Sequence, residues 1–189
     1  MDMLFSCLAA IHHTYEPKEA ILYALSVGMS KNPLDEQDLP YTYELNNTIG
    51  QLLVVPSFPV IWPNDLMTQI TELSSFQFNP AMLLHGEHEV IVPDRLPSEC
   101  TVLTRGKISH IFDKQKSSVV VFDTESVNKD TGEVLAYNRA KLLVRGVGGF
   151  GGDRGSLQAA YEKVPERKPD CSVKCPTEPN LALLYRYVS

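Results

Sequence analysis

One short stretch of the chain combines side chains that could do chemistry with a residue that leaves space for a ligand. His85 and His88 bracket Gly86 and Glu87 in the sequence. Two histidines this close suggest a metal site. However, residues three apart on a strand face opposite sides of the sheet, so we expect the two imidazoles not to converge. With no third histidine and carboxylate arranged nearby, we expect no metal here.

For His85 itself, two interpretations stay open. A glycine allows close backbone approach, so a ligand carbonyl could reach backbone N–H groups at a turn formed by His85 and Gly86. Alternatively, His85 is a histidine whose hydrogen bonds are satisfied within the core. Residue types alone do not decide between a ligand-binding histidine and a structural one.

Two other polar residues have both a structural and a functional interpretation. Lys114 lies in an Asp-Lys-Gln-Lys turn, where it is either a solvated hairpin lysine or a mobile cation at the mouth of a pocket for a phosphate-bearing ligand. Asn138 alternates with inward-facing apolar residues, so it must find partners if buried, and a structural role is favoured. Because no nucleophile–base spacing or pair of carboxylates appears, we expect no catalytic residue.

The elements that must position these residues are mostly strands. Three period-two segments are joined by residues typical of antiparallel hairpins. The last of them places Ala140, Leu142 and Val144 on one face and Arg139, Lys141 and Arg145 on the other. We expect an α+β fold, an antiparallel sheet with short helices, from these predicted elements: strands 41–45, 52–56, 89–92, 100–112, 117–127 and 133–145; helices 17–28, 65–73 and one beginning at 181.

Composition excludes several classes of function. A formal net charge of −6 provides no basic surface for nucleic acid. No stretch has the length or flanks of a transmembrane helix or signal peptide, so we expect no membrane association. Four scattered cysteines indicate reduced thiols. The glycine-rich segment 146–152 contains G-x-G-x-x-G, but it follows a meander instead of opening a βαβ unit, so we interpret it as a flexible exit from the sheet.

Five separated motifs together resemble those of a known family, the type 2 (MaoC-like) 2-enoyl-CoA hydratases, which include the hydratase part of the peroxisomal multifunctional enzyme of β-oxidation. The resemblance covers roughly residues 15–189. The motifs are Glu19-Ala20-Ile21-Leu22-Tyr23-Ala24-Leu25-Ser26-Val27-Gly28, Leu84-His85-Gly86-Glu87, Asp113-Lys114, Tyr137-Asn138 and Gly148-Gly149-Phe150-Gly151-Gly152.

The resemblance implies a double hot-dog fold whose N-terminal, degenerate half houses the fatty acyl tail. The C-terminal half of such enzymes carries Gly-Asp-x-Asn-Pro-Leu-His, whose Asp and His activate the water that converts a trans-2-enoyl-CoA into a (3R)-3-hydroxyacyl-CoA. It implies substrate contacts from His85, Gly86 and Lys114, no cofactor beyond the CoA thioester substrate, and association as a homodimer or with a second hot-dog half. Peroxisomal location follows from the resemblance only, since no targeting signal is recognisable.

This sequence lacks the Gly-Asp-x-Asn-Pro-Leu-His motif. We therefore expect the N-terminal half of such a hydro-lyase, from an isoform, fragment or partial gene model, that binds acyl-CoA but is inactive alone. The expected organisation is an irregular leader (1–14), an acyl-CoA-binding hot-dog domain (15–152), and a linker with the start of a missing second hot dog (153–189). The alternative is a truncated, non-catalytic interaction or regulatory module that pairs with another hot-dog chain.

Overall fold

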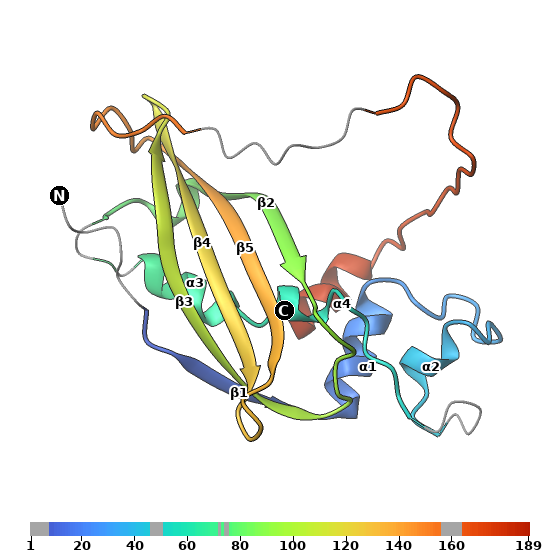
Figure 1. The fold of residues 1–189 in the computed structure, drawn as a ribbon. Helices are drawn as coiled ribbons and strands as arrows, with labels where there is room; N and C mark the ends of the chain where they lie inside the picture. Colours follow the sequence, from blue (N-terminus) through green and yellow to red (C-terminus); the bar gives the residue numbers. More distant parts are fainter. Residues whose placement is uncertain (1–7, 46–50, 72, 74–75, 156–163) are drawn as a thin grey trace.

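A five-stranded antiparallel sheet organises the chain in this computed structural model, which describes residues 8–45, 51–71, 73, 76–155 and 164–189 (Figure 1). The strand order across the sheet is β1-β3-β4-β5-β2, so β1 and β2 are its two edges. The strands are β1 Ile11–Tyr15, β2 Leu83–Ile91, β3 Cys100–Asp113, β4 Ser117–Asn128 and β5 Val134–Arg145.

The three long strands β3, β4 and β5 form the meander that the sequence predicts. Their ends differ from the predicted ones by one residue at most, because the two connections contain residues suited to tight turns. Gly132 has φ +77° in the second connection, a conformation that glycine adopts without steric cost. The predicted alternation in β5 is confirmed: Ala140, Leu142 and Val144 are buried, whereas Arg139 and Arg145 are exposed.

One face of the sheet is covered by the short helix α3, Asn64–Thr71, which begins one residue before the predicted range 65–73 and stops two residues before its end (Figure 1). Leu66 and Ile70 of α3 are fully buried against Ile108, Phe122 and other side chains of the sheet. This helix-covered face is called the inner face below. The eight residues of α3 leave much of the inner face to other segments, among them the 3₁₀ turn η1, Phe58–Val60.

A second apolar cluster lies at the end of the sheet near α1, Pro17–Ser26. Tyr15, Tyr23, Phe58 and Trp62 pack together in it, with neighbouring ring centroids 5.1–5.8 Å apart. The sequence predicts this helix over residues 17–28. Its most buried apolar side chains are Ala20, Tyr23 and Ala24, whereas Ile21, Leu22 and Leu25 are half-buried.

The last helix, α4, Leu181–Val188, also reaches this cluster. It packs beside α1, and the Tyr185 ring lies 6.2 Å from that of Tyr23 (Figure 1). The sequence predicts a helix starting at Leu181, and the structure confirms it. A single turn of 3₁₀ helix, η2, Pro80–Met82, leads into β2.

Three expectations about the N-terminal third are wrong. Residues 41–45 contain no strand, because helix α2, Leu39–Thr42, occupies this region. Residues 52–56 are not a strand either, although Leu52 and Val54 are buried. The leader 1–14 is not irregular throughout, because β1 begins at Ile11 and pairs with β3; residues 1–7 lie outside the described residues.

Within the described ranges, no helix combines the length and apolar character needed to cross a membrane.

Candidate functional site

Gly86 lies inside a strand and not at a turn, contrary to the expectation from the sequence. β2 pairs with β5 on both sides of it, and the register shifts between His85 and Glu87, which makes Gly86 the extra residue of a β-bulge. A Cβ atom added at Gly86 would lie 3.1 Å from the Lys141 carbonyl oxygen, so glycine allows β2 to approach β5 closely at this point.

The bulge also overturns the prediction that the two histidines diverge. His85 pairs with Leu142 and His88 pairs with Ala140, and both of these β5 residues belong to the buried inner face. The extra residue therefore returns His88 to the side that His85 occupies. His85 Nε2 and His88 Nδ1 are 3.2 Å apart, within hydrogen-bonding distance.

Behind the histidine pair, a buried amide completes a chain of hydrogen bonds. His88 Nε2 lies 2.9 Å from Asn138 Oδ1, and Asn138 Nδ2 donates to the Pro59 carbonyl oxygen at 3.2 Å. Asn138 is only 4% exposed, so these bonds satisfy an amide that water cannot reach. This series of hydrogen bonds runs from the exposed His85 on the edge strand β2 to η1 in the interior.

The environment of His85 favours an uncharged ring. Burial of part of the ring lowers the pKa of His85, and the neighbouring His88 lowers it further, while the backbone carbonyl of Glu87 acts in the opposite direction. A neutral imidazole can both donate and accept a hydrogen bond, so His85 can hold a polar ligand without supplying charge. Nowhere in the described ranges do three His, Cys, Asp or Glu side chains gather as metal ligands would.

The Glu87 side chain lies on the opposite face of the sheet from His85, His88 and Asn138. It pairs with Lys141 on the outer face of the sheet, where Glu87 Oε2 and Lys141 Nζ are 2.5 Å apart. The side chains of residues 85–88 therefore lie on both faces of the sheet, with His85 and His88 on the inner face and Glu87 on the outer face.

Lys114 lies in the β3–β4 hairpin, away from His85. Strand β5 separates this hairpin from β2, so Lys114 and His85 lie on elements that are not neighbours in the sheet. Lys114 Nζ donates to the carbonyl oxygens of Arg154 and Gly155, the latter at 3.0 Å, and lies 5.8 Å from the centre of the Phe112 ring. The ammonium is thus positioned by the segment that follows the glycine-rich loop.

The glycine-rich loop leaves the sheet after β5, as predicted, and is held by one buried carboxylate. Asp113 accepts hydrogen bonds from the backbone N–H groups of Gly149 and Gly151 at 2.8 Å and of Gln115 at 2.7 Å. The bond from Gly149, with those from the other backbone N–H groups, holds the pKa of Asp113 below its ordinary value. The loop is therefore fastened to the hairpin that carries Lys114.

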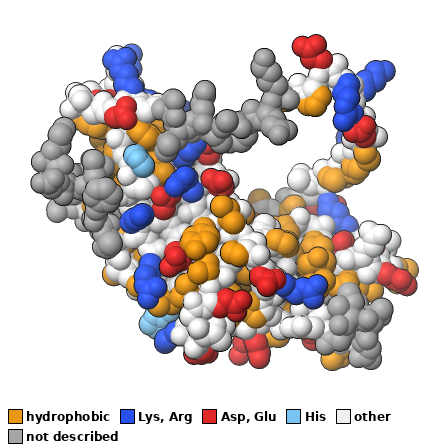
Figure 2. Space-filling model, viewed as in Figure 1, with side chains coloured by type: hydrophobic (Ala, Val, Ile, Leu, Met, Phe, Trp, Pro, Cys, Tyr) orange, Lys and Arg blue, Asp and Glu red, His pale blue; other side chains and the backbone are white. Residues whose placement is uncertain are grey.

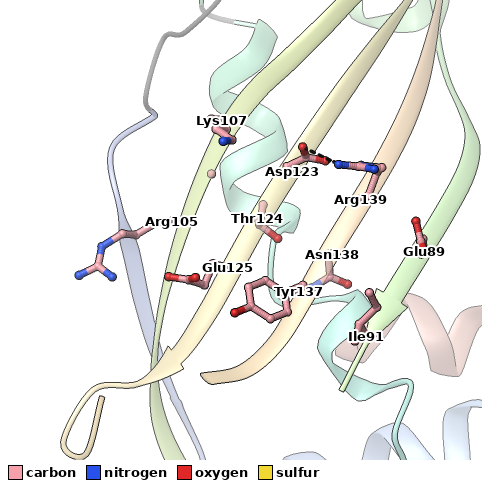
Figure 3. Close-up of a pocket in the computed structure, with 11 residues that line it drawn as sticks. Glu89, Ile91, Arg105, Lys107, Asp123, Thr124, Glu125, Tyr137, Asn138 and Arg139 are labelled. Carbon is pink, nitrogen blue, oxygen red and sulfur yellow. Dashed lines mark hydrogen bonds and ion pairs between the residues drawn. The ribbon is translucent and has the colours of Figure 1, made fainter. Parts of the chain in front are cut away.

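The sequence did not predict a groove of about 510 Å³ on the outer face of the sheet (Figure 3). Glu89, Arg139, Asp123 and Lys107 follow one another in register across four strands, so the charge alternates from strand to strand. Arg139 donates to both Asp123 oxygens, at 2.7 and 3.1 Å. Figure 2 shows acidic and basic side chains interspersed with hydrophobic ones over this view of the molecule.

None of the three predicted site residues lines this groove. A period-two pattern could have identified its residues as outward-facing, but no pattern in the sequence reports that the sheet is hollowed there.

A second cavity, of about 620 Å³, lies between β1, α1, the segment around α3 and the end of α4. His13 and Trp62 line it, and among the described atoms their Nε2 and Nε1 atoms are buried without a hydrogen-bond partner. Burial lowers the pKa of His13, and Asp65 opposes this effect. No pattern in the sequence identifies His13, which lies in the range 1–14 that we expect from the sequence to be irregular.

Comparison with known proteins places these features in a family context. The sequence matches the family model described as MFE-2 hydratase 2 N-terminal domain over residues 13–146. It is 36% identical over 184 residues to the peroxisomal multifunctional enzyme type 2 of Mus musculus, covering 95% of this chain and 24% of that protein. It is 30% identical over 190 residues to the peroxisomal enoyl-CoA hydratase 2 of Arabidopsis thaliana, covering 95% of this chain and 60% of that protein.

Among solved structures, the MaoC-like dehydratase from Phytophthora capsici is similar over 97% of this chain and 61% of its own, with a TM-score of 0.76 and 27% identity. This similarity, with the sheet order, confirms the predicted hot-dog fold. The chain thus spans less than two thirds of the length of each of these three proteins.

Proposed function

The chain belongs to the family of MFE-2 hydratase 2 N-terminal domains, and on that premise we propose that it is the acyl-CoA-binding half of a 2-enoyl-CoA hydratase 2. The reaction is the addition of water to a trans-2-enoyl-CoA to form a (3R)-3-hydroxyacyl-CoA in fatty-acid β-oxidation. Peroxisomal location belongs to the same proposal and is supported by the names of the plant and mouse relatives.

The observation that carries the proposal is the bulge at Gly86. It leaves His85 exposed at the edge of the sheet while its ring nitrogen is held by His88. The ring also bonds to the Glu87 backbone carbonyl. A single ring N–H that serves both contacts leaves the other nitrogen to a ligand. We place the thioester end of acyl-CoA at this edge, against His85 and Gly86.

Lys114 has a separate role in the proposal. Its ammonium donates to the carbonyl oxygens of Arg154 and Gly155, which leaves donor capacity because an ammonium has three N–H groups. We propose that Lys114 meets a phosphate group of CoA. The distance between β2 and the β3–β4 hairpin then has to be spanned by the ligand itself, and CoA is a long molecule with its phosphates remote from the thioester.

The hydration step is assigned to a second hot-dog half. In this proposal, the Asp and His of a Gly-Asp-x-Asn-Pro-Leu-His motif in that half activate the water. Proton transfer by such groups typically contributes about 10²–10⁴-fold to a rate. We therefore expect the 189-residue chain alone to bind acyl-CoA without hydrating it. Loss of enoyl-thioester absorbance at a rate typical of such enzymes, with the pure chain, would contradict this.

The binding test uses a saturated acyl-CoA, which cannot be hydrated, titrated into the chain in a calorimeter. His85→Ala should weaken binding by about 5- to 30-fold, because a hydrogen bond in a partly desolvated site contributes about 1–2 kcal/mol. His12→Ala is the matched control: an exposed histidine on β1, at the opposite edge of the sheet. Equal effects of the two substitutions, with both variants folded, would remove His85 from the site.

The second candidate function is an interaction module that pairs with another hot-dog chain without catalysis. It is supported by β1 and β2, which within the described ranges form the two edges of the sheet and so offer backbone groups to another strand. Light scattering distinguishes the two candidates when combined with the titration: association with a hot-dog partner but no acyl-CoA binding, alone or in the pair, favours the interaction module.

A further inference from the structure

The hydrogen bonds behind His85 have a direction, and it is set at their buried end. A carbonyl oxygen can only accept, so the side-chain nitrogen of Asn138 must face the Pro59 carbonyl at 3.2 Å. The amide oxygen of Asn138 then faces His88 Nε2 at 2.9 Å. Because this oxygen can only accept, His88 must carry its proton on Nε2.

The same logic continues to the surface. A neutral His88 protonated on Nε2 has a lone pair on Nδ1, which can only accept a hydrogen bond. His85 Nε2 lies 3.2 Å from that atom, so it must be the donor. A neutral His85 protonated on Nε2 has its own lone pair on Nδ1.

We propose that Asn138 and His88 are positioning residues that fix His85 as the Nε2–H tautomer, so that His85 meets its ligand as a hydrogen-bond acceptor through Nδ1. The identity of the ligand group that bonds to His85 Nδ1 rests on the proposed acyl-CoA binding, and the chemistry of this nitrogen then selects one group of acyl-CoA. The thioester carbonyl is itself only an acceptor and cannot bond to this nitrogen. The nearest donor in a CoA thioester is the amide N–H of the cysteamine unit, close to the sulfur.

The charges around His85 are compatible with this assignment. Partial burial and His88 lower the pKa of His85, which favours the neutral ring, while a hydrogen bond from the ring to the Glu87 backbone carbonyl acts in the opposite direction. In the proposed tautomer, the single ring N–H on Nε2 serves both His88 and this carbonyl. Glu87 and Lys141 neutralise each other on the opposite face of the sheet. Asn138 of β5 and Pro59 of η1, which form the buried end of this series of hydrogen bonds, carry no charge.

The tautomer can be measured directly on the ¹⁵N-labelled chain, without ligand, from two-bond ¹H–¹⁵N correlations of the histidine rings above neutral pH. We expect the Nε2–H pattern for both His85 and His88, whereas His12 serves as an exposed internal reference. An Nδ1–H pattern or a charged ring at His85 would overturn the proposal.

Two substitutions at His88 separate positioning from simple packing. His88→Leu removes both hydrogen bonds and should leave His85 as a mixture of tautomers. His88→Gln should restore the single tautomer, because an amide can donate to Asn138 and accept from His85 at once. If His88→Leu folds and His85 remains a pure Nε2–H tautomer, then His88 does not set it.

The ligand assignment is tested with a saturated acyl-CoA and an analogue whose cysteamine amide N–H is replaced by an ester oxygen. We expect the analogue to bind the wild-type chain about 5- to 20-fold more weakly, and the two ligands to bind His85→Ala equally. A similar loss in both proteins would overturn the assignment. If neither ligand binds the wild-type chain, the proposed function fails and the ligand assignment fails with it, whereas the tautomer measurement still decides the role of Asn138 and His88.

Discussion

At the scale of single residues, Asp113 links the β3–β4 hairpin to the glycine-rich loop. Its carboxylate accepts from three backbone N–H groups of the hairpin and the glycine-rich loop while only 5% exposed. An amide at this position has one acceptor oxygen where the carboxylate has two. We therefore expect Asp113→Asn to lower the thermal unfolding midpoint at neutral pH, measured by circular dichroism.

The same residue predicts a pH dependence. Because the folded-state pKa of Asp113 is lowered, its contribution to stability is present above the pKa of an unfolded carboxyl, about 3.9, and is lost as the pH falls through the lower folded value. The difference in midpoint between wild type and Asp113→Asn should narrow over that acidic range. Asp130→Asn, in the exposed β4–β5 connection, is the control. A difference that stayed constant into acid would argue against the role of the carboxylate.

At the scale of elements, the bulge in β2 decides which side chains face inward. Deleting Gly86 removes the extra residue, so the strand must either withdraw Leu83 from the core or turn Glu89 toward it. Each alternative loses apolar burial or buries a charge, and we expect a cost of about 2–4 kcal/mol in the free energy of unfolding, measured by urea denaturation.

Gly86→Ala is the matched control for the deletion, since it keeps the number of residues and so keeps the bulge. Its added Cβ meets only the Lys141 carbonyl oxygen, at 3.1 Å, and a small displacement can relieve that contact. The deletion should therefore cost clearly more than the substitution. Equal costs would mean that the inward and outward pattern of β2 does not depend on the extra residue.

The sequence predicted the elements whose signals are local. Strands β3 to β5 combine alternating side chains with turn residues, and α1 begins at a proline and is followed by Gly28, which has φ +92°. Strand β1 was missed because it is a short edge strand, defined by its pairing with β3 and not by its own pattern. The region of α2 alternates like a strand, but no strand in the described part of the chain pairs with it.

The site was predictable in its residues but not in its geometry. The histidines and Asn138 could be selected from the sequence as polar groups near apolar strands. Their convergence could not, because it depends on a register shift that is visible only in the pairing of β2 with β5. The hydrogen-bond partners of Lys114 could not be predicted from the sequence either, because Arg154 and Gly155 are about 40 residues away in the chain.

At the scale of the whole molecule, an aromatic cluster joins the sheet to α1 and α4. Phe58 is 3% exposed, and its ring centre lies 5.1 Å from both Tyr15 and Tyr23 and 5.6 Å from Trp62. Phe58→Ala should lower the free energy of unfolding by about 3–5 kcal/mol, through lost burial and the cavity left behind, measured by urea denaturation.

The control for this substitution is Leu34→Ala, because Leu34 is 82% exposed. Its effect should remain within about 0.5 kcal/mol. A small effect of Phe58→Ala would mean that the cluster closes over the missing ring. It would also mean that α1 and the sheet are held together mainly by their other contacts.

The bulge has one more consequence, for self-association. Edge strands expose unpaired backbone groups on which another chain can extend a sheet, and such pairing begins aggregation. On β2, the irregularity at Gly86 divides this exposed row into two short runs that a straight incoming strand cannot match together. The opposite edge, β1, has only five residues. Both margins of the sheet are thus poor templates for unselective strand addition, and a partner that pairs with β2 must carry a backbone fitted to its bend.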